Sequence, residues 1–411
     1  MRFAIIGLGG RGSVYAHFIK FYGSQVVAVC DPDKSKLEFA KNEYGVKKEN
    51  LFTDENEFFK AGKLADALVI STLDTIHYRQ TMAALDVGYD ILLEKPIAMT
   101  LKECEDIRDK AIEKKKKVVI CHVLRYSPFS ITVKKLISEK AIGDVVSLNM
   151  TEEIGYYHFA HSYVRGNWRN TKISTPLILA KNCHDIDFIY WLLGEKCISV
   201  SSVGGLKHFN KENAPKGAAK HCVDCVHKDS CKYSCFYIYN NADYEKVAGL
   251  AKHGKLGETK EQIDKSLSNR DNVYSRCVYY CDNDVCDHQT VNMIFDKQIT
   301  AQFLSVAFSN DMPRRLKIYG TEGILSGETQ GNVEIEKLNG EKYTVKVEYP
   351  TGGYAHHAGG DVGIIKQFIE YVETDKMPEN VTDIASSVMG HKIAFLADES
   401  RKQNGKTFFI E

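Results

Sequence analysis

The chain has 411 residues, of which 44% are apolar, so it is long enough for two to four domains that each bury a core. Its 54 lysine and arginine residues balance its 54 aspartate and glutamate residues, so no overall field draws it to nucleic acid or to a membrane surface. We expect neither a secretory signal nor a bilayer span, because the chain enters an apolar run and a glycine turn at once. These features exclude a disordered or fibrous protein and predict an enzyme or a sensor of the cytoplasm.

Short, continuous apolar runs recur through the first part of the chain, separated by stretches long enough to form helices. The runs cover residues 3–6, 26–30, 67–70, 91–93 and 118–121. Runs without polar alternation are typical of strands that are buried on both faces. Thr100 and Glu103 form a capping box ahead of a helical pattern. The alternation of strand and helix predicts a parallel sheet with right-handed crossovers.

A glycine-rich turn follows the first apolar run and precedes a helical pattern. It consists of Gly7, Leu8, Gly9, Gly10, Arg11 and Gly12. In such a turn the glycines allow a tight bend and a close approach to a pyrophosphate, which faces the free amides of the helix. Asp31 ends the second run, where a carboxylate accepts from ribose hydroxyls and repels a 2′-phosphate. The turn predicts a dinucleotide site that favours NAD over NADP, a preference that a nearby basic side chain could reverse.

The fourth run leads directly into the motif Glu-Lys-Pro at 94–96, in front of the capped helix. In this position after a dinucleotide turn, the motif resembles that of the Gfo/Idh/MocA oxidoreductases, named for glucose–fructose oxidoreductase and inositol dehydrogenase. The segments 317–323 and 359–361 extend the resemblance along nearly the whole chain, and the cysteine-rich stretch at about 205–285 fits it least. The resemblance implies further contacts with the cofactor, which come from Ser71, Thr72, His77, Glu94, Lys95 and Pro96.

The resemblance implies an α/β protein with two domains. The first is a Rossmann domain at residues 1–122, and the second, at 123–411, is an α/β domain on a large, open, mostly antiparallel sheet with a cysteine-rich excursion. Alternation of apolar and polar residues at 146–151 and 299–303 independently indicates strands covered on one face. We expect a substrate cleft between the domains, and a homodimer or homotetramer formed through the open sheet face.

The implied chemistry is hydride transfer between a carbinol carbon and nicotinamide C4, which needs a base for the hydroxyl proton and donors for the oxyanion. Lys95 is the first candidate, and its alternative role is a bridge to Glu94 or to a ribose. His184 is the second, although the family has an aspartate four residues earlier, where this chain has Ala180. Lys181 either replaces that carboxylate as a donor to substrate oxygens, or it faces away and His184 works with Asp185 or Lys95 alone. The sequence leaves both possibilities open.

Aromatic and polar side chains crowd the stretch 156–169, between the domain junction and the helix of His184. Aromatic faces stack on the C–H surface of a sugar, and arginine and histidine donate to its hydroxyls or to a carboxylate. We expect substrate contacts from Arg125, Tyr126, His161, Arg165, Trp168, Arg169, His184 and His357. The same composition is typical of a subunit interface, which is the alternative.

Four of the twelve cysteines lie in one short segment, at Cys222, Cys225, Cys231 and Cys235. Four thiolates at this spacing predict a structural zinc site, with an iron–sulfur cluster or metal-free thiols as alternatives. Five other cysteines are scattered in mostly apolar surroundings, as is typical of a reducing compartment.

Three classes of function follow from these features. The first is an NAD(P)-dependent dehydrogenase or reductase of a sugar, sugar acid or cyclitol. The second is a redox-neutral glycoside hydrolase, in which transient oxidation by bound NAD acidifies a C–H bond and a substituent is eliminated. The third is a ligand sensor without turnover, against which the pair Lys95 and His184 argues.

Overall fold

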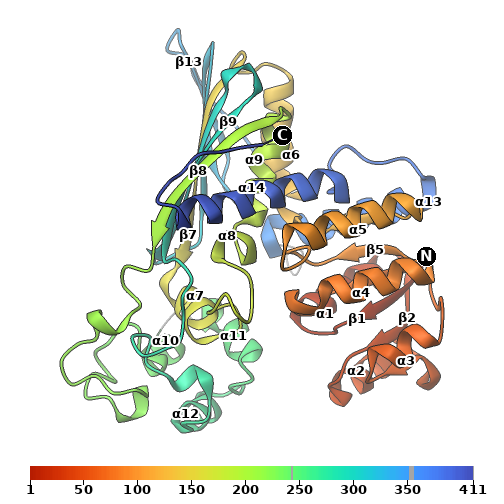
Figure 1. Cartoon of the computed structure of the whole chain (residues 1–411), viewed down its shortest axis with the longest axis vertical. Helices are drawn as coiled ribbons and strands as arrows, with labels where there is room; N and C mark the ends of the chain where they lie inside the picture. Colours follow the sequence, from red (N-terminus) through yellow and green to blue (C-terminus); the bar gives the residue numbers. More distant parts are fainter. Residues whose placement is uncertain (242–243, 351–355, 411) are drawn as a thin grey trace.

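The computed structural model describes residues 1–241, 244–350 and 356–410. The N-terminal part is a parallel sheet, as expected (Figure 1). It has six strands, in the order β3-β2-β1-β4-β5-β6. Its strands are β1 (Arg2–Ile6), β2 (Gln25–Cys30), β3 (Leu51–Phe52), β4 (Ala67–Ile70), β5 (Asp90–Leu93) and β6 (Val118–Ile120). The strand order reverses between β1 and β4, which is the place where open parallel sheets bind ligands at their carboxyl ends.

Helices on both sides of this sheet bury its apolar strands. They are α1 (Gly10–Phe21), α2 (Lys34–Tyr44), α3 (Glu55–Lys60), α4 (Asp74–Val87) and α5 (Leu101–Glu113). The expected capping box begins α5, where Thr100 accepts from the Glu103 amide and Glu103 accepts from the Thr100 amide. Two helices from the end of the chain return to this domain: α13 (Gly360–Thr374) contacts α1, and α14 (Ile384–Lys402) contacts α5.

The second sheet has nine strands in the order β14-β13-β12-β11-β7-β10-β9-β8-β15. All of its pairings are antiparallel except that of β7 with β10, so the expectation of a mostly antiparallel sheet is confirmed. The strands are β7 (Val145–Gly155), β8 (Cys197–Gly205), β9 (His288–Phe295), β10 (Thr300–Ser309), β11 (Arg314–Gly320), β12 (Gly323–Glu328), β13 (Val333–Lys337), β14 (Lys342–Val345) and β15 (Phe408–Phe409).

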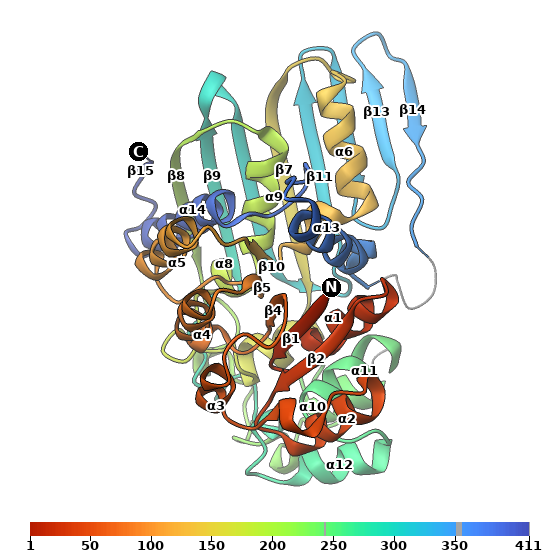
Figure 2. The ribbon, with the colours of Figure 1, turned by 90° about the vertical axis from the view of Figure 1, so that its right-hand side faces the viewer.

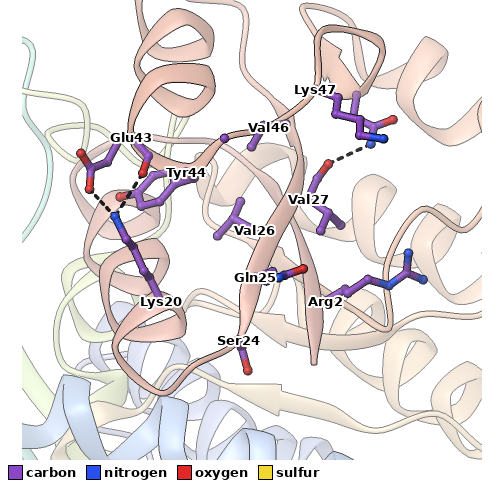
Figure 3. A pocket seen from close by; sticks show the side chains of 12 residues that line it. Arg2, Lys20, Ser24, Gln25, Val26, Val27, Glu43, Tyr44, Val46 and Lys47 are labelled. Atoms are coloured by element: carbon purple, nitrogen blue, oxygen red, sulfur yellow. Dashed lines mark hydrogen bonds and ion pairs between the residues drawn. The ribbon is translucent and has the colours of Figure 1, made fainter.

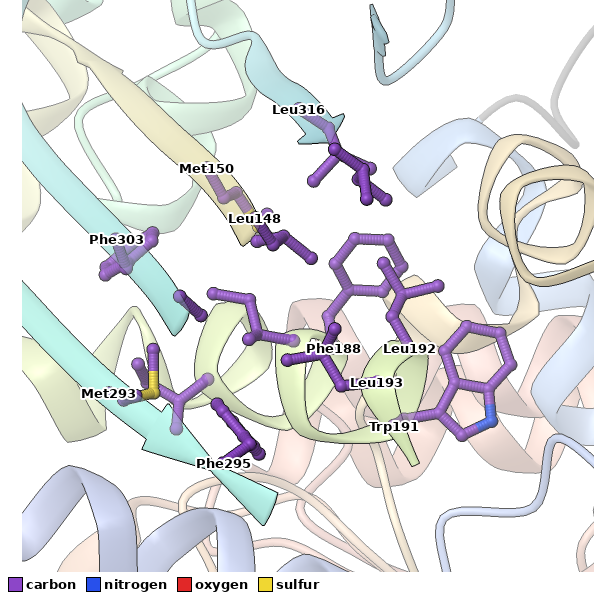
Figure 4. Packing of buried hydrophobic residues seen from close by; sticks show 14 of the residues in the cluster. Leu148, Met150, Phe188, Trp191, Leu192, Leu193, Met293, Phe295, Phe303 and Leu316 are labelled. Carbon is purple, nitrogen blue, oxygen red and sulfur yellow. The ribbon is translucent and has the colours of Figure 1, made fainter. Parts of the chain in front are cut away.

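One face of the nine-stranded sheet is covered by helices and forms the largest apolar core. Figures 1 and 2 place α6 (Pro128–Ser138), α9 (Cys183–Leu193) and α14 on the side of the sheet that faces the Rossmann domain. In Figure 4, Phe188 and Leu192 of α9 lie among the inward side chains of the strands, such as Leu148 and Phe303. This packing fixes α9, and with it His184, against the rigid sheet.

The chain between β8 and β9 forms the cysteine-rich excursion with a core of its own. It holds α10 (Cys235–Asn241), α11 (Tyr244–His253) and α12 (Lys260–Ser268), and it packs on α7 (Tyr156–Phe159) and the π-helical turn Ala160–Arg165. Phe209 and Tyr233 are buried in this core. Within the ranges described, the structure has no helix that is long and apolar enough to cross a membrane.

Candidate functional site

The glycine turn between β1 and α1 is shaped for close packing on one side and is open on the other. Gly7 has φ +87°, and a Cβ on Gly12 would lie 2.1 Å from the Gly7 carbonyl oxygen, so both positions require glycine. Ser71 Oγ donates to the same carbonyl at 2.7 Å. A Cβ on Gly9 would meet no atom within 4 Å, so the backbone there is open to a ligand ahead of the first amides of α1. This cradle fits the pyrophosphate of a dinucleotide.

Asp31 at the end of β2 is buried and holds the turn. Its carboxylate accepts from the amides of Leu8 at 2.8 Å and Asp33 at 2.9 Å. Lys36 Nζ lies 3.1 Å from the same carboxylate, so the basic neighbour that could change the cofactor preference is present. Selection of NAD over NADP therefore stays a prediction.

Two hollows meet at Thr72, at the carboxyl edge of the Rossmann sheet. One, of about 280 Å³, is lined by Gly7, Cys30 and Arg79 and lies within the Rossmann domain. The other, of about 230 Å³, lies between the two domains. Its lining includes Arg11, Ser71, Glu94, Lys95, His158, Trp168, Ala180, Lys181, His184 and Arg314. The predicted cleft is thus present, next to the glycine turn.

A larger hollow of about 500 Å³ lies elsewhere, at the amino ends of β1 and β2 (Figure 3). Lys20 in its wall donates to the carboxylate of Glu43 at 2.9 Å and to that residue's carbonyl at 3.2 Å. Its charge is thus compensated, and the hollow is far from the carboxyl edge where parallel sheets bind ligands.

Lys95 reaches across the interdomain cavity from the end of β5. Its Nζ donates to the carbonyl oxygen of Ala180, in the second domain, at 2.7 Å. The expected alternative, a bridge to Glu94, is not what the structure shows, because Glu94 accepts from Arg11 at 2.8 Å and from Tyr15 at 2.5 Å. Burial would raise the pKa of Glu94, but Arg11 and Lys95 outweigh this effect and lower it. The ammonium group is therefore directed across the cavity to the second domain.

His184 lines the same cavity from the first turn of α9 and is buried. Its ring packs edge-on against the ring of His122, with centroids 5.5 Å apart. Burial, assisted by Arg125 and Lys95, lowers the pKa of His122 well below its usual value, so this neighbour is neutral. The structure thus brings Lys95 and His184 to one cavity from opposite domains.

Lys181 also faces this cavity, which decides between the two orientations that the sequence left open. Its Nζ lies 3.1 Å from Glu152, and burial lowers its pKa. Arg314 lines the same wall and binds both Glu152 at 3.0 Å and Asp185 at 2.6 Å. Arg314 and Glu152 were not predicted from the sequence, whereas Asp185 was considered only as a partner of His184. Only Glu152 gave a signal, as a charged residue in the buried register of β7.

Most of the predicted substrate contacts have other partners. Arg125 is buried and donates to Asp187 at 2.7 and 2.5 Å, and the Tyr126 hydroxyl bonds with Thr382. Neither position faces the cavity with its polar group, because these groups join the interdomain turn Val123–Tyr126 to neighbouring helices and loops. His357 has its side chain outside the described residues.

The stretch 156–169 mainly forms the core under the excursion. His161 stacks on Tyr274 with centroids 4.4 Å apart, and Arg165 donates to the backbone carbonyls of Arg276 and Tyr233 at 2.7 Å each. Arg169 pairs with Asp282 at 2.8 Å. In the structure these arginines bond to carbonyls and acids of the excursion, and contact of any of them with substrate stays a prediction. Trp168 is the member of this stretch, among the predicted contacts, that lines the cavity.

Three residues that were predicted to contact the cofactor, His77, Arg11 and Glu94, hold neighbouring loops together in the structure. His77 is buried between two loops, with Nδ1 2.8 Å from the Pro96 carbonyl oxygen and Nε2 3.2 Å from that of Thr72, and its single N–H donates to one of them. Arg11 pairs with Glu94 and also with Asp361 of α13, at 2.6 Å. These contacts position the loop that presents Lys95.

The predicted zinc site is not supported. In the part of the chain that the structure describes, no three histidine, cysteine, aspartate or glutamate side chains gather in a group that could hold a metal ion. Cys235 is turned into the core at the start of α10, where it hydrogen-bonds Cys222. This bond and the Arg165 guanidinium, 3.8 Å from Cys222 Sγ, lower the pKa of Cys222 to about 5 against the effect of burial. The thiols are free.

The comparisons with known proteins agree with this architecture. A family model described as an oxidoreductase family with an NAD-binding Rossmann fold matches residues 1–122, and its C-terminal α/β domain matches 134–405. The oxidoreductase YteT of Bacillus subtilis is 23% identical over 82% of this chain and 80% of its own length. Inositol 2-dehydrogenase of Klebsiella pneumoniae is 27% identical over 49% of this chain and 56% of its own length.

Solved structures share the whole fold. An inositol dehydrogenase homolog from Azotobacter vinelandii, complexed with NAD+, covers 100% of this chain and 97% of its own at 14% identity, with a TM-score of 0.72. An oxidoreductase from Agrobacterium radiobacter, in complex with NAD+, L-tartaric acid and magnesium, covers 100% and 98% at 15% identity, with a TM-score of 0.71. Since both domain models match in order and together cover most of the sequence, the chain belongs to the Gfo/Idh/MocA family of NAD-binding oxidoreductases.

Proposed function

We propose that this protein is an NAD-dependent dehydrogenase or reductase that transfers a hydride between the nicotinamide and a carbinol carbon of a sugar, sugar acid or cyclitol. Residues 1–122 would bind the cofactor, and 123–411 would bind the substrate. The observation that supports this most is the position of Lys95 and His184, which line one cavity from opposite domains next to the glycine turn. The free cysteines agree with a reducing compartment such as the cytoplasm.

The glycine turn and the end of β2 would hold the cofactor. The open backbone at Gly9 and the first amides of α1 would face the pyrophosphate, and Asp31 with Lys36 would contact the ribose. When bound, NAD supplies the hydride acceptor or donor. The hollow that Gly7, Cys30 and Arg79 line would receive the adenosine end.

Lys95 and His184 divide the work on the substrate hydroxyl. The Lys95 ammonium, anchored by the Ala180 carbonyl, donates to the reacting oxygen and stabilises the negative charge that develops on it. His184 accepts the hydroxyl proton in oxidation and returns it in reduction. Trp168 closes one side of the cavity and excludes water from the reacting carbon.

A panel of free sugars, aldonates, uronates, cyclitols and aryl glycosides tests this function. We expect net NADH formation from at least one free hydroxyl compound. Release of the aryl group without net NADH would contradict the proposal and indicate the redox-neutral glycoside hydrolase. Cofactor binding without either product would indicate a sensor.

A further inference from the structure

Two cationic side chains form one wall of the interdomain cavity. Lys181 follows α8 (Leu177–Ala180), and Arg314 begins β11, so segments far apart in the sequence supply the two charges. Their side chains are 18% and 12% exposed. Both therefore reach the surface of the cavity that also contains Lys95 and His184.

The acids that balance these cations lie behind them. Glu152 on β7 and Asp185 on α9 are buried, at 1% and 0% exposure, and neither lines the cavity. Asn182 donates to both carboxylates, at 2.8 and 3.1 Å, which holds them in place. A molecule in the cavity thus meets the two cations and not their counterions. The acids that do line the cavity, Asp74 and Glu94, accept from Ser174 and from Arg11.

Lys181, Arg314, Glu152 and Asp185 form one cluster, and its two acids carry less negative charge than two ionised carboxylates would. Burial and the adjacent Glu152 raise the pKa of Asp185 to about 7, against the opposing effect of Arg314. A proton therefore resides on this carboxyl for part of the time near neutrality, and the four groups together are positive.

Arg314 also has N–H donors that its two acidic partners do not use. Within the described ranges, Nε and Nη2 bind the two acids, and the structure records no bond from Nη1. The planar guanidinium is suited to a carboxylate, and charge-assisted bonds of this kind are about twice as strong as neutral ones. Hydroxyl groups of a neutral cyclitol would bind here more weakly.

We infer that Lys181 and Arg314 bind a carboxylate of the substrate, so that the compound which reacts at Lys95 and His184 is a sugar acid, a hexuronate or an aldonate. The reaction rests on the proposed function, whereas the binding does not. The carboxylate would lie on the sheet side of the cavity, and the ring or chain would extend toward Lys95 and Trp168.

Calorimetric titration of the NAD-loaded protein tests whether the negative charge of a ligand, at nearly constant ligand shape, raises its affinity. D-glucuronate, D-galacturonate and D-gluconate are compared with the methyl ester of each hexuronate, D-glucose and myo-inositol. We expect at least one acid to bind about tenfold or more tightly than its neutral counterpart. Equal or weaker binding of every acid, including no binding at all, overturns the inference.

Three variants locate the effect. Lys181→Gln and Arg314→Gln should each remove most of the preference for the acid, whereas Lys317→Gln, on an exposed side chain of the same strand as Arg314, should keep it. Unchanged acid preference in Lys181→Gln overturns the assignment. Circular dichroism and NAD affinity show whether Arg314→Gln folds, and Lys181→Gln decides the question if it does not.

The outcomes also separate this inference from the proposed function. Selective binding of an acid without any NADH formation would contradict the dehydrogenase and leave the anion site. NADH formation from neutral compounds, without preference for an acid, would contradict the anion site and leave the dehydrogenase.

Discussion

Lys95 is held by a carbonyl from the other domain, because its Nζ donates to Ala180 at 2.7 Å. The position of the ammonium group thus depends on both domains at once, while the cofactor turn lies entirely in the first. Loss of this group should affect the chemistry much more than it affects binding of NAD.

Lys95→Met should lower turnover at least about a hundredfold, because it removes the donor to the reacting oxygen. The dissociation constant for NAD should change by less than about tenfold. Steady-state kinetics and fluorescence titration measure the two quantities. Lys102→Met, on the exposed side of α5, is the matched control. A Lys95→Met enzyme with near-normal turnover would refute the assigned role.

Asp31 is proposed to contact the ribose of the cofactor. Asp31→Ala removes the carboxylate that repels a 2′-phosphate and leaves Lys36 free to attract it. We expect the ratio of the NAD and NADP dissociation constants to move toward NADP by about tenfold or more. Asp66→Ala, on an exposed acid near the start of β1, is the control. An unchanged ratio would show that another residue selects the cofactor.

The residues that the sequence identified best are those whose role depends on backbone geometry. Gly7 and Gly12 have no room for a side chain, and this requirement is visible as a motif. Arg125 and Arg165 were assigned to substrate because a guanidinium suits a hydroxyl or a carboxylate. The same group suits a buried aspartate or a backbone carbonyl equally well, and only the fold decides which it meets.

At the scale of elements, the buried pair Arg125 and Asp187 joins the interdomain turn to α9, the helix that carries His184. Two further groups, Glu152 and Asp185, join β7 to the same helix through Arg314. Polar contacts between elements therefore determine where the proposed base lies.

Arg125→Ala should destabilise the protein by about 3–5 kcal/mol, because it leaves the Asp187 carboxylate buried without its partner. Urea unfolding measures this loss. Arg108→Ala, which breaks a surface pair with Asp109, should change stability by about 0.5 kcal/mol or less. Normal stability in Arg125→Ala, combined with a raised KM, would restore the substrate role predicted from sequence.

The Asp185 carboxyl should make stability depend on pH. Its pKa in the folded protein, about 7, exceeds its value of about 3.9 in the unfolded chain, so its contribution is complete below about pH 4 and is lost toward pH 7. The unfolding free energy of wild type minus that of Asp185→Asn should therefore fall over this range.

Urea midpoints at several pH values between these limits test the prediction. Glu261→Gln, an exposed acid of α12, should give a flat difference over the same range. A difference that is constant or rises with pH for Asp185→Asn would contradict the raised pKa.

At the scale of the whole molecule, Figure 1 shows that α6, α9 and α14, which cover the nine-stranded sheet, lie on its Rossmann-facing side, and in the part of the chain that the structure describes no helix is drawn against the opposite side. Ile294 on β9 is 49% exposed, and Leu304 on β10 is half-buried. We propose that a second copy of the chain covers this face.

Ile294→Lys should shift the protein toward monomer in light scattering coupled to size exclusion, because it replaces an exposed apolar side chain of this face with a charge. Ile112→Lys is the control, since Ile112 is exposed on α5 of the other domain. A wild-type protein that is monomeric at all concentrations would contradict the interface.

The architecture was predictable because continuous apolar runs indicate buried strands and the glycine motif indicates a tight turn. The apolar runs of β4 and β5 and the capping box of α5 are local features. The wall of the interdomain cavity that Lys181 and Arg314 form was not predictable in the same way. Lys181 and Arg314 meet only through the packing of α9 on the sheet, and a spacing of four cysteines does not show that Cys235 enters a core.

Transfer of deuterium is the most direct test of the central claim, that Lys95 and His184 enclose a carbinol carbon next to the nicotinamide. The protein is incubated with NAD and with carbon-deuterated D-glucuronate, D-gluconate, D-glucose or myo-inositol, and the cofactor is analysed by mass spectrometry. We expect deuterium in the reduced cofactor from at least one compound, and its loss in Lys95→Met. Reduced cofactor without deuterium, or no reduced cofactor from any of the four, would contradict the account.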